Sequence, residues 1–147
     1  MSTIITKEIE IDMGHRIPNH KSKCKNLHGH RYKIQAGVIG SVQNIKDESD
    51  EGMVLDFGDL KQVMNTYIHD VYDHGFMFYK NDFFAQWFNE TEQNIHLVSF
   101  IPTAENLAEY WFKKLEQGLY EKNSQLCLYY VTVWETPTST ATYKKNE

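Results

Sequence analysis

Residues 3–40 read TIITKEIEIDMGHRIPNHKSKCKNLHGHRYKIQAGVIG, and this stretch decides the fold. Apolar side chains occupy alternate positions in residues 3–13, where only Lys7 breaks the pattern, and again in residues 30–40. These side chains are Ile5, Ile9, Ile11, Tyr32, Ile34, Ala36 and Val38. Alternation of this kind predicts two β-strands, and the polar residues 14–29 predict the loop that joins them.

Two helices are expected in the middle of the chain. Residues 58–72 repeat apolar side chains at helical spacing, and Asp56 stands before them where an N-cap belongs. The apolar face comprises Leu60, Val63, Met64, Tyr67, Ile68 and Val71. A second helix is predicted to begin at the N-cap Thr103 and to end at Gly118.

Two further strands are expected near the C-terminus, over residues 125–135 and 138–144. The order β-β-α-α-β-β predicts an α+β fold, with a four-stranded antiparallel sheet and two helices on one face. The aromatic-rich residues 75–101 are less regular, although their sequence IHLVSF is typical of a short extra strand. The length of 147 residues fits a single domain, 1–147.

The composition argues against several classes of function. The net charge is -5, whereas binding to DNA or RNA needs a surplus of Lys and Arg. No stretch reaches the about 20 apolar residues of a membrane span, and the first residues lack the pattern of a signal peptide. Cys24 and Cys127 lie far apart in sequence, so we expect free thiols and a cytoplasmic location.

The sequence HGH at residues 28–30 carries the strongest chemical signal. In an extended chain His28 and His30 point to the same side, and Gly29 leaves room between them. His15 ends the first strand, which a hairpin brings beside the second. Three neutral histidines without a fourth protein ligand are typical of a catalytic zinc site. The alternative is a loop with surface histidines.

Cys24 lies four residues before His28 and has two interpretations. As a fourth zinc ligand it would close the site and make it structural. As a free thiol it would be available for catalysis, and the surrounding Lys21, Lys23 and Lys25 would favour its thiolate. The residues alone leave both interpretations open.

Several other positions carry weaker signals. Asp73 and His74 follow the first helix, where an aspartate can orient a proton-transferring imidazole. A histidine at a helix C-terminus is also common for its interaction with the helix dipole. Glu135 ends a strand, either as a polar flank or as an anchor for paired N–H donors. Thr103 and Glu105 are explained as a cap and a first-turn acid.

Five runs of sequence follow one another along the chain: GHRIPNHKSKCKNLHGHRYK, MVLDFGDLK, DHG, PTAENLAEYW and VWETPTSTATY. In this order they resemble the 6-pyruvoyl-tetrahydropterin synthase family. The resemblance implies a tunnelling fold whose subunits assemble into barrels, as trimers or hexamers with active sites at subunit interfaces. Residues 75–101 depart from it, because they are longer than in the compact members.

The resemblance also implies a cofactor and catalytic residues. It places zinc on three histidines: His15, His28 and His30. Cys24 matches the family's proton-transfer cysteine, and Asp73 with His74 matches its Asp–His pair. For the substrate, Glu135 matches the pterin-anchoring glutamate.

Thr103 and Glu105 match a second pterin-contacting segment of the family. Three residues separate Cys24 from His28, which is similar to the bacterial 6-carboxy-5,6,7,8-tetrahydropterin synthases of the queuosine pathway. The implied activity is that of a zinc-dependent carbon–carbon lyase. It would convert 7,8-dihydroneopterin triphosphate into 6-carboxytetrahydropterin, acetaldehyde and triphosphate.

Two alternatives accompany this expectation. A 6-pyruvoyltetrahydropterin synthase would use the same site to eliminate triphosphate and stop at the diketone. A non-catalytic zinc-binding module would instead have Cys24 as its fourth ligand.

Overall fold

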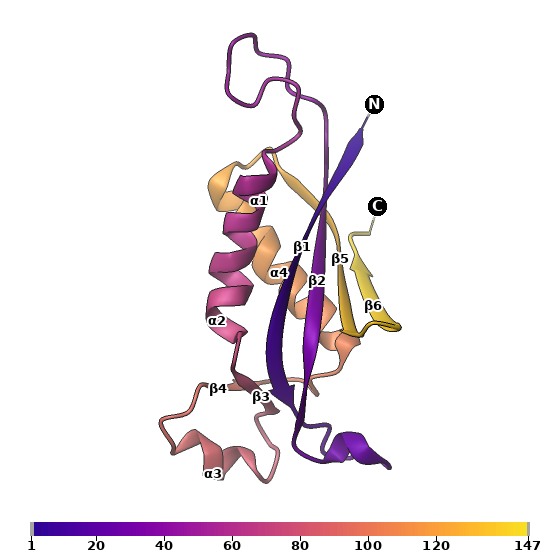
Figure 1. The fold of residues 1–147 in the computed structure, drawn as a ribbon, viewed down its shortest axis with the longest axis vertical. Helices are drawn as coiled ribbons and strands as arrows, with labels where there is room; N and C mark the ends of the chain where they lie inside the picture. The colour runs from indigo at the N-terminus through magenta and orange to yellow at the C-terminus, as the bar shows by residue number, and fades with distance from the viewer. Residues whose placement is uncertain (1, 147) are drawn as a thin grey trace.

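The computed structural model describes residues 2–146 and centres on a six-stranded sheet in the order β4-β3-β1-β2-β5-β6. The strands are β1 (Thr3–His15), β2 (His28–Gly40), β3 (Phe76–Tyr79), β4 (Ile95–Val98), β5 (Cys127–Thr136) and β6 (Ser139–Lys144). The helical segments are η1 (Lys23–Lys25), α1 (Phe57–Met64), η2 (Asn65–His69), α2 (Asp70–Tyr72), α3 (Ala85–Asn89) and α4 (Ala104–Lys122). Both α1 and α4 lie on one face of the sheet, as the sequence predicts (Figure 1).

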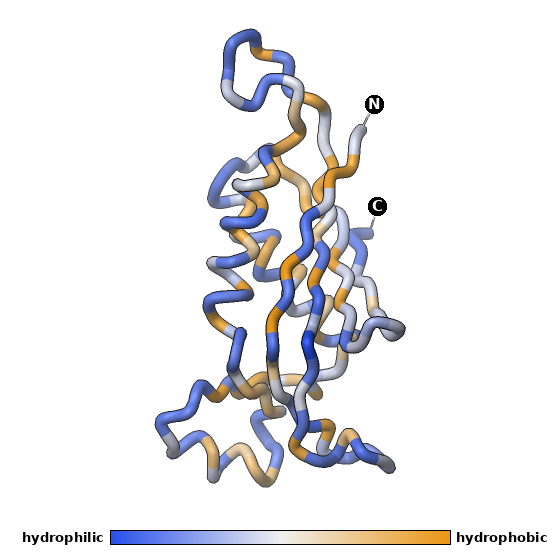
Figure 2. Tube along the Cα trace, viewed as in Figure 1, coloured by the Kyte–Doolittle hydropathy of each residue, from blue (hydrophilic) through white to orange (hydrophobic). Residues whose placement is uncertain are grey.

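β1 and β2 form the predicted hairpin and pair antiparallel from Thr3 opposite Gly40 to His15 opposite His28. Side chains alternate between the two faces of the sheet, and hydrophilic and hydrophobic residues alternate along these strands in Figure 2. The buried positions of the hairpin include Ile9, Ile11, Met13, Tyr32, Ile34, Ala36 and Val38. The connecting loop is shorter than predicted, because both strands extend as far as the histidines.

The first helix contains a π turn that the apolar pattern does not reveal. α1, η2 and α2 follow one another without a break, and η2 is π-helical. A π turn takes more residues than an α turn, so the buried face moves by one residue. Tyr72 is therefore buried, whereas Val71, predicted on the apolar face, is 39% exposed. The N-cap prediction is confirmed, because the Asp56 carboxylate accepts a hydrogen bond from the Gly58 N–H at 2.7 Å.

The second predicted helix is α4, and its start is confirmed. The Thr103 hydroxyl accepts a hydrogen bond from the Asn106 N–H at 3.2 Å. The predicted end at Gly118 is wrong, because α4 continues to Lys122. A Cβ on Gly118 would lie 2.5 Å from Cε2 of Tyr67, so the aromatic ring already occupies this space. Gly118 permits close packing between the two helices and does not end α4.

The prediction of a four-stranded sheet is wrong, because residues 75–101 add two strands to it. β3 runs parallel to β1 at Gly14 and His15, and β4 runs parallel to β3. The short strand expected in IHLVSF is confirmed as β4. The four predicted strands are β1, β2, β5 and β6, and they pair antiparallel in that order.

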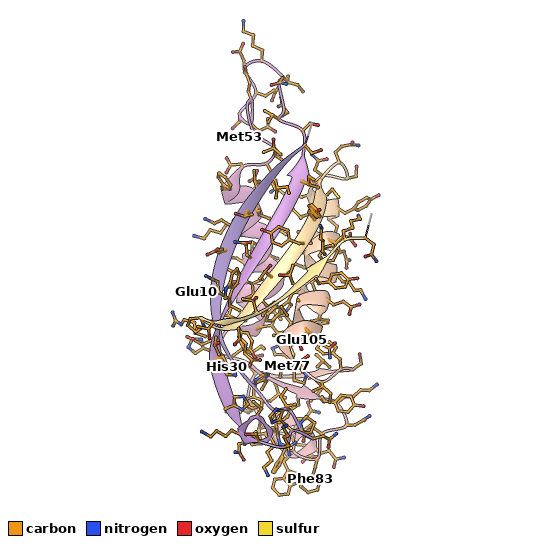
Figure 3. The ribbon with its side chains drawn as sticks, turned by 90° about the vertical axis from the view of Figure 1, so that its right-hand side faces the viewer. Glu10, His30, Met53, Met77, Phe83 and Glu105 are labelled. Atoms are coloured by element: carbon orange, nitrogen blue, oxygen red, sulfur yellow. The ribbon has the colours of Figure 1, made fainter. Side chains whose placement is uncertain are left out.

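A buried ion pair fixes the added segment to the end of β1. The Arg16 guanidinium donates from Nη1 to Oδ1 of Asp82 at 2.6 Å, and the Asp82 side chain has no exposed surface. The same guanidinium lies 4.8 Å from the centre of the Phe84 ring, a cation–π contact. In Figure 3, Phe83 marks the tip of this segment, below the end of the sheet that carries His30.

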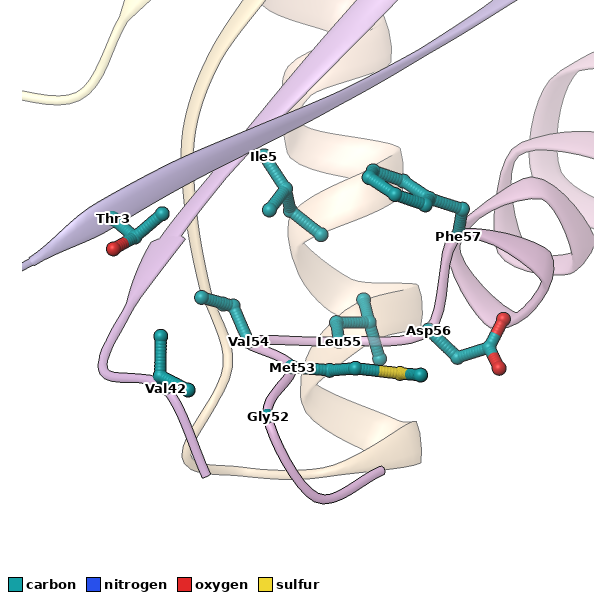
Figure 4. Close-up of a pocket in the computed structure, with 9 residues that line it drawn as sticks. All are labelled: Thr3, Ile5, Val42, Gly52, Met53, Val54, Leu55, Asp56 and Phe57. Carbon is teal, nitrogen blue, oxygen red and sulfur yellow. The ribbon is translucent and has the colours of Figure 1, made fainter. Parts of the chain in front are cut away.

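The opposite end of the sheet has an apolar hollow. The connection from β2 to α1 runs past the start of β1 and leaves a hollow of about 220 Å³ (Figure 4). Ile5, Val54 and Leu55 are among its lining residues. Within residues 2–146, no helix has the length and apolar character needed to cross a membrane.

Replacing Gly118 by alanine tests the packing between the helices. In an open helix this change would stabilise the protein by about 1 kcal/mol. Here the new methyl group meets Tyr67, so we expect a loss of about 1–3 kcal/mol. Urea unfolding of Gly118→Ala, Tyr67→Ala and the double variant measures the coupling. Equal effects of Gly118→Ala with and without the Tyr67 ring would contradict this account.

Candidate metal centre

The hairpin register brings the three predicted histidines together. His15 stands opposite His28, and His30 stands opposite Met13, two residues further along β2. All three alternate with the buried side chains of the core, so they point to the helix-covered face. His15 is almost completely buried, at 1% exposure, while His28 and His30 are half-buried.

The rings are close enough to share one ion. Their centroids lie 4.6 Å apart for His15 and His28, 5.1 Å for His15 and His30, and 5.0 Å for His28 and His30. One nitrogen from each ring lies within 4.8 Å of the others. Among the described residues, this group contains neither Cys24 nor a carboxylate, so its donors are three imidazoles.

Backbone carbonyls fix the orientation of two of the rings. His15 donates from Nδ1 to the Pro102 carbonyl at 2.7 Å, and His28 donates from Nδ1 to the Asn26 carbonyl at 2.7 Å. A carbonyl can only accept, so both Nδ1 atoms carry a proton, and in the neutral form of each ring Nε2 keeps a lone pair. These two Nε2 atoms lie 3.0 Å apart. Two lone pairs at this distance repel each other unless a cation lies between them.

Burial favours the neutral form of His15 and of His30. The pKa of His15 is lowered to about 4, mainly by burial; His28 and His30 also lower it, and the hydrogen bond to Pro102 acts in the opposite direction. The pKa of His30 is also lowered, mainly by burial, although Glu135 acts in the opposite direction. Neutral imidazole is the form that binds metal, so few protons compete for these nitrogens near neutral pH.

A buried nitrogen of His30 without a hydrogen-bond partner also fits a metal site. Nε2 of His30 is buried and has no hydrogen-bond partner among the described residues. Its nearest charged atom is Oε1 of Glu135 at 3.7 Å, beyond hydrogen-bonding distance. A buried nitrogen without a partner is unfavourable, and coordination would satisfy it. Three neutral nitrogens and no fourth protein ligand fit zinc with an open position.

Glu135 and Cys24 lie beside this centre. The Glu135 carboxylate is next to His30, and its side chain is 24% exposed. Burial raises the pKa of Tyr32, and the charges of Glu135 and Cys24 raise it further. The Tyr32 hydroxyl lies 3.1 Å from Nδ1 of His15. Glu135 is therefore a neighbour of the imidazoles, whereas the role of Cys24 stays a prediction.

The Asp73–His74 pair has a defined geometry but lies apart from the three histidines. Nδ1 of His74 lies 2.8 Å from Oδ2 of Asp73, and the Asp12 N–H donates to Oδ1 of Asp73 at 2.8 Å. This backbone donor is the main cause that lowers the pKa of Asp73, and His74 adds to it. The His74 ring is 78% exposed. It lines an open hollow with Asp12 and Arg31, which belong to the outer face of the sheet.

The remaining predicted residues lie at the start of α4. Thr103 follows Pro102, whose carbonyl orients His15, so this N-cap adjoins the candidate metal centre. Glu105 is exposed in the first turn of α4, and within residues 2–146 it does not belong to the three-histidine group. From the sequence, Tyr32 is expected only as an apolar strand residue, although it follows His28 and His30 in the same alternation. The sequence gives no sign that Pro102 orients His15, because this contact uses the backbone carbonyl, which every residue has.

These features define the class of protein, a small α+β protein with a candidate three-histidine metal centre at the end of a β-hairpin. Comparison with known proteins then gives the family. The sequence model of 6-pyruvoyl tetrahydropterin synthase matches residues 4–146, and the chain belongs to this family.

Two relatives are named 6-carboxy-5,6,7,8-tetrahydropterin synthase. The protein of Haemophilus influenzae is 34% identical over 145 residues, covering 96% of this chain and 98% of its own. The protein of Rickettsia felis is 38% identical over 138 residues, covering 90% and 93%. The structure of Caenorhabditis elegans 6-pyruvoyl tetrahydropterin synthase superposes with a TM-score of 0.68 and 28% identity, covering 99% and 97%.

Single histidine substitutions test the candidate metal centre. We expect the protein to bind about one zinc ion per chain. His30→Ala should weaken zinc binding by more than about 100-fold, since even the loss of an outer partner costs about 10- to 100-fold. His20→Ala is the matched control, because the His20 ring accepts a hydrogen bond from the nearby Ser22 N–H and does not belong to the three-histidine group. Competition with a chelating dye measures both affinities, and equal values for the two variants would contradict the assignment.

Proposed function

We propose that the chain is a zinc-dependent 6-carboxy-5,6,7,8-tetrahydropterin synthase. It would convert 7,8-dihydroneopterin triphosphate into 6-carboxytetrahydropterin, acetaldehyde and triphosphate. The observation that carries the proposal is the cluster of three imidazoles, each with one nitrogen within 4.8 Å of the others and without a fourth protein ligand among the described residues. The names of relatives at 34% and 38% identity support the choice of reaction.

The proposal gives each residue of the site a separate task. His15, His28 and His30 would hold zinc, which when bound acts as a Lewis acid and makes hydroxyl groups more acidic. Cys24, as thiolate, would move protons on the substrate side chain. Glu135 would accept paired N–H donors from the edge of the pterin ring, and Thr103 with Glu105 would contribute to this contact.

His74 would carry the second proton transfer. Nδ1 of His74 is engaged by Asp73 at 2.8 Å, so Nε2 is the nitrogen available for a substrate. The contact with a carboxylate also stabilises the imidazolium that forms when Nε2 takes a proton. Because His74 lines the outer face of β1, we propose that it serves the metal centre of a neighbouring subunit.

A homo-oligomer, trimer or hexamer, is part of the proposal. β3 pairs with β1 only at Gly14 and His15, so residues 3–13 of β1 have a free edge among the described residues. β6 is an outer strand of the sheet. Free edges in a folded protein need covering, and the apolar hollow beside Ile5 lies at the start of the β1 edge (Figure 4). Pairing between the edges of neighbouring copies would close the barrel.

Three further parts of the proposal follow from the family rather than from the geometry. The chain would act as a single domain over residues 1–147, with residues 75–101 as an extension. The enzyme would be cytoplasmic and serve queuosine biosynthesis. It would use neither nucleic acid nor membrane as a partner.

The product separates this proposal from the nearest alternative. We expect purified protein with zinc to release 6-carboxytetrahydropterin and acetaldehyde from 7,8-dihydroneopterin triphosphate, as measured by mass spectrometry. A 6-pyruvoyltetrahydropterin synthase, the name of the Caenorhabditis elegans structure, would retain the three-carbon side chain. Detection of that diketone without acetaldehyde would replace the proposed activity by the alternative one.

Substitution of Cys24 should lower the reaction rate, whereas substitution of Glu135 should weaken substrate binding. Cys24→Ala should lower the single-turnover rate by roughly 100-fold or more, with little change in binding, as expected for a general acid–base group. Glu135→Ala should weaken binding by about 2–4 kcal/mol, because ring N–H groups lose a charged acceptor. Calorimetry and rapid mixing measure these two quantities.

Zinc content is the control for both variants and should be unchanged. Loss of zinc from Cys24→Ala would make Cys24 a ligand and favour the non-catalytic zinc-binding module. Normal substrate binding by Glu135→Ala would show that Glu135 does not bind the pterin ring and is only a polar residue at the end of a strand.

A further inference from the structure

Tyr32 is a buried tyrosine whose hydroxyl lies behind one of the candidate metal ligands. The residue has 0% exposure, and its hydroxyl oxygen is 3.1 Å from Nδ1 of His15. Tyr32 follows His30 by two residues on β2, so its side chain shares the face of the three imidazoles. Its ring centroid lies 5.6 Å from that of His30 and 5.9 Å from that of His15, in edge-to-face contacts. The phenol therefore packs against two of the three candidate ligands.

The hydroxyl has one hydrogen-bond partner within residues 2–146, and this partner is Nδ1 of His15. Nδ1 gives its proton to the Pro102 carbonyl at 2.7 Å, so it has no lone pair for the hydroxyl hydrogen. The Tyr32 oxygen is then a second acceptor for the Nδ1 proton. Burying a hydroxyl is unfavourable unless it is well bonded. A phenylalanine would fill the same space without this cost, so packing alone does not explain the hydroxyl group.

We propose that Tyr32 is a positioning residue of the candidate metal centre, and that its oxygen holds the His15 ring together with the Pro102 carbonyl. The inference rests on the proposed function, because it concerns the zinc that this function needs. A histidine that binds a metal through one nitrogen is oriented by the acceptor at its other N–H. A cation at Nε2 also increases the positive charge of the Nδ1 proton, so a second acceptor there favours the metal-bound state.

Replacing Tyr32 by phenylalanine removes the oxygen and keeps the ring, which also packs against Trp111 at 6.2 Å between centroids. The Nδ1 proton of His15 keeps the Pro102 carbonyl, so no buried donor loses its last acceptor. We therefore expect the metal-free variant to be as stable as the unsubstituted protein. Its zinc affinity should fall by about 10-fold, the lower end of the range for outer partners of a metal site, because one acceptor remains.

Tyr72→Phe is the matched control. Tyr72 is also buried, at 4% exposure, and its hydroxyl lies 2.9 Å from the Tyr110 hydroxyl. Neither tyrosine contributes to the three-histidine group. Loss of this hydrogen bond should lower the stability of the metal-free protein and leave the zinc affinity unchanged. The two variants thus predict opposite patterns of stability and metal binding.

Three measurements on the full chain separate these patterns. Competition with a chelating dye gives the zinc affinity, and urea unfolding with a chelator present gives the metal-free stability. In excess zinc, the expected 10-fold loss corresponds to a free energy of unfolding lower by about 1.4 kcal/mol for Tyr32→Phe. Cobalt(II) in place of zinc adds a spectroscopic readout. Its visible absorption bands should shift in Tyr32→Phe and stay unchanged in Tyr72→Phe.

Several results would overturn the inference. Equal zinc affinity and equal cobalt spectra in Tyr32→Phe and the unsubstituted protein would show that the hydroxyl does not position His15. A lower metal-free stability with unchanged zinc affinity would make the hydroxyl a structural group only. An equal loss of zinc affinity in Tyr72→Phe would assign the effect to general destabilisation. Absence of zinc binding by the unsubstituted protein would instead contradict the metal centre, and with it the proposed function.

Discussion

The register between β1 and β2 is the constraint on which the candidate metal centre depends. His15 stands opposite His28, and His30 lies two residues further along the same face. Because side chains alternate with a period of two, a slip of one residue would turn His28 and His30 to the outer face and leave His15 without them. The apolar positions that bury β1 and β2 in the core hold this register, so the core and the site are specified by the same alternation.

Burial then prepares the imidazoles for a cation. Removing His15 from water disfavours its protonated form and lowers its pKa to about 4. The carbonyls of Pro102 and Asn26 fix which nitrogen of His15 and of His28 carries the remaining proton. These backbone groups come from the residue before the α4 N-cap and from the loop before β2. The ligand set is thus oriented by elements far apart in sequence, although the ligands themselves lie on one hairpin.

Whether a feature depends on neighbouring or on distant residues explains which features the sequence could predict. The three histidines follow from spacing within one hairpin, and the caps Asp56 and Thr103 follow from side chains next to their helices. Gly118 misled the prediction, because its cause is the Tyr67 ring on another helix. The same holds for the parallel strands of residues 75–101, whose partners are set by long-range packing. Single-chain patterns carry local information, and these features depend on contacts between distant segments.

β1 also explains why the two parts of the proposed site lie on different faces. The Asp12 N–H binds the Asp73 carboxylate, and the Asp12 carbonyl accepts from the His74 N–H at 2.7 Å. These bonds hold His74 at a φ of 63°, in the left-handed region, where a residue with a side chain is rarely stable without support. His15 lies three residues after Asp12 on β1 and points to the opposite face, toward the other imidazoles. The sheet therefore separates His74 from the metal centre of its own chain, and this separation is the reason for the proposal that His74 serves the centre of a neighbouring copy.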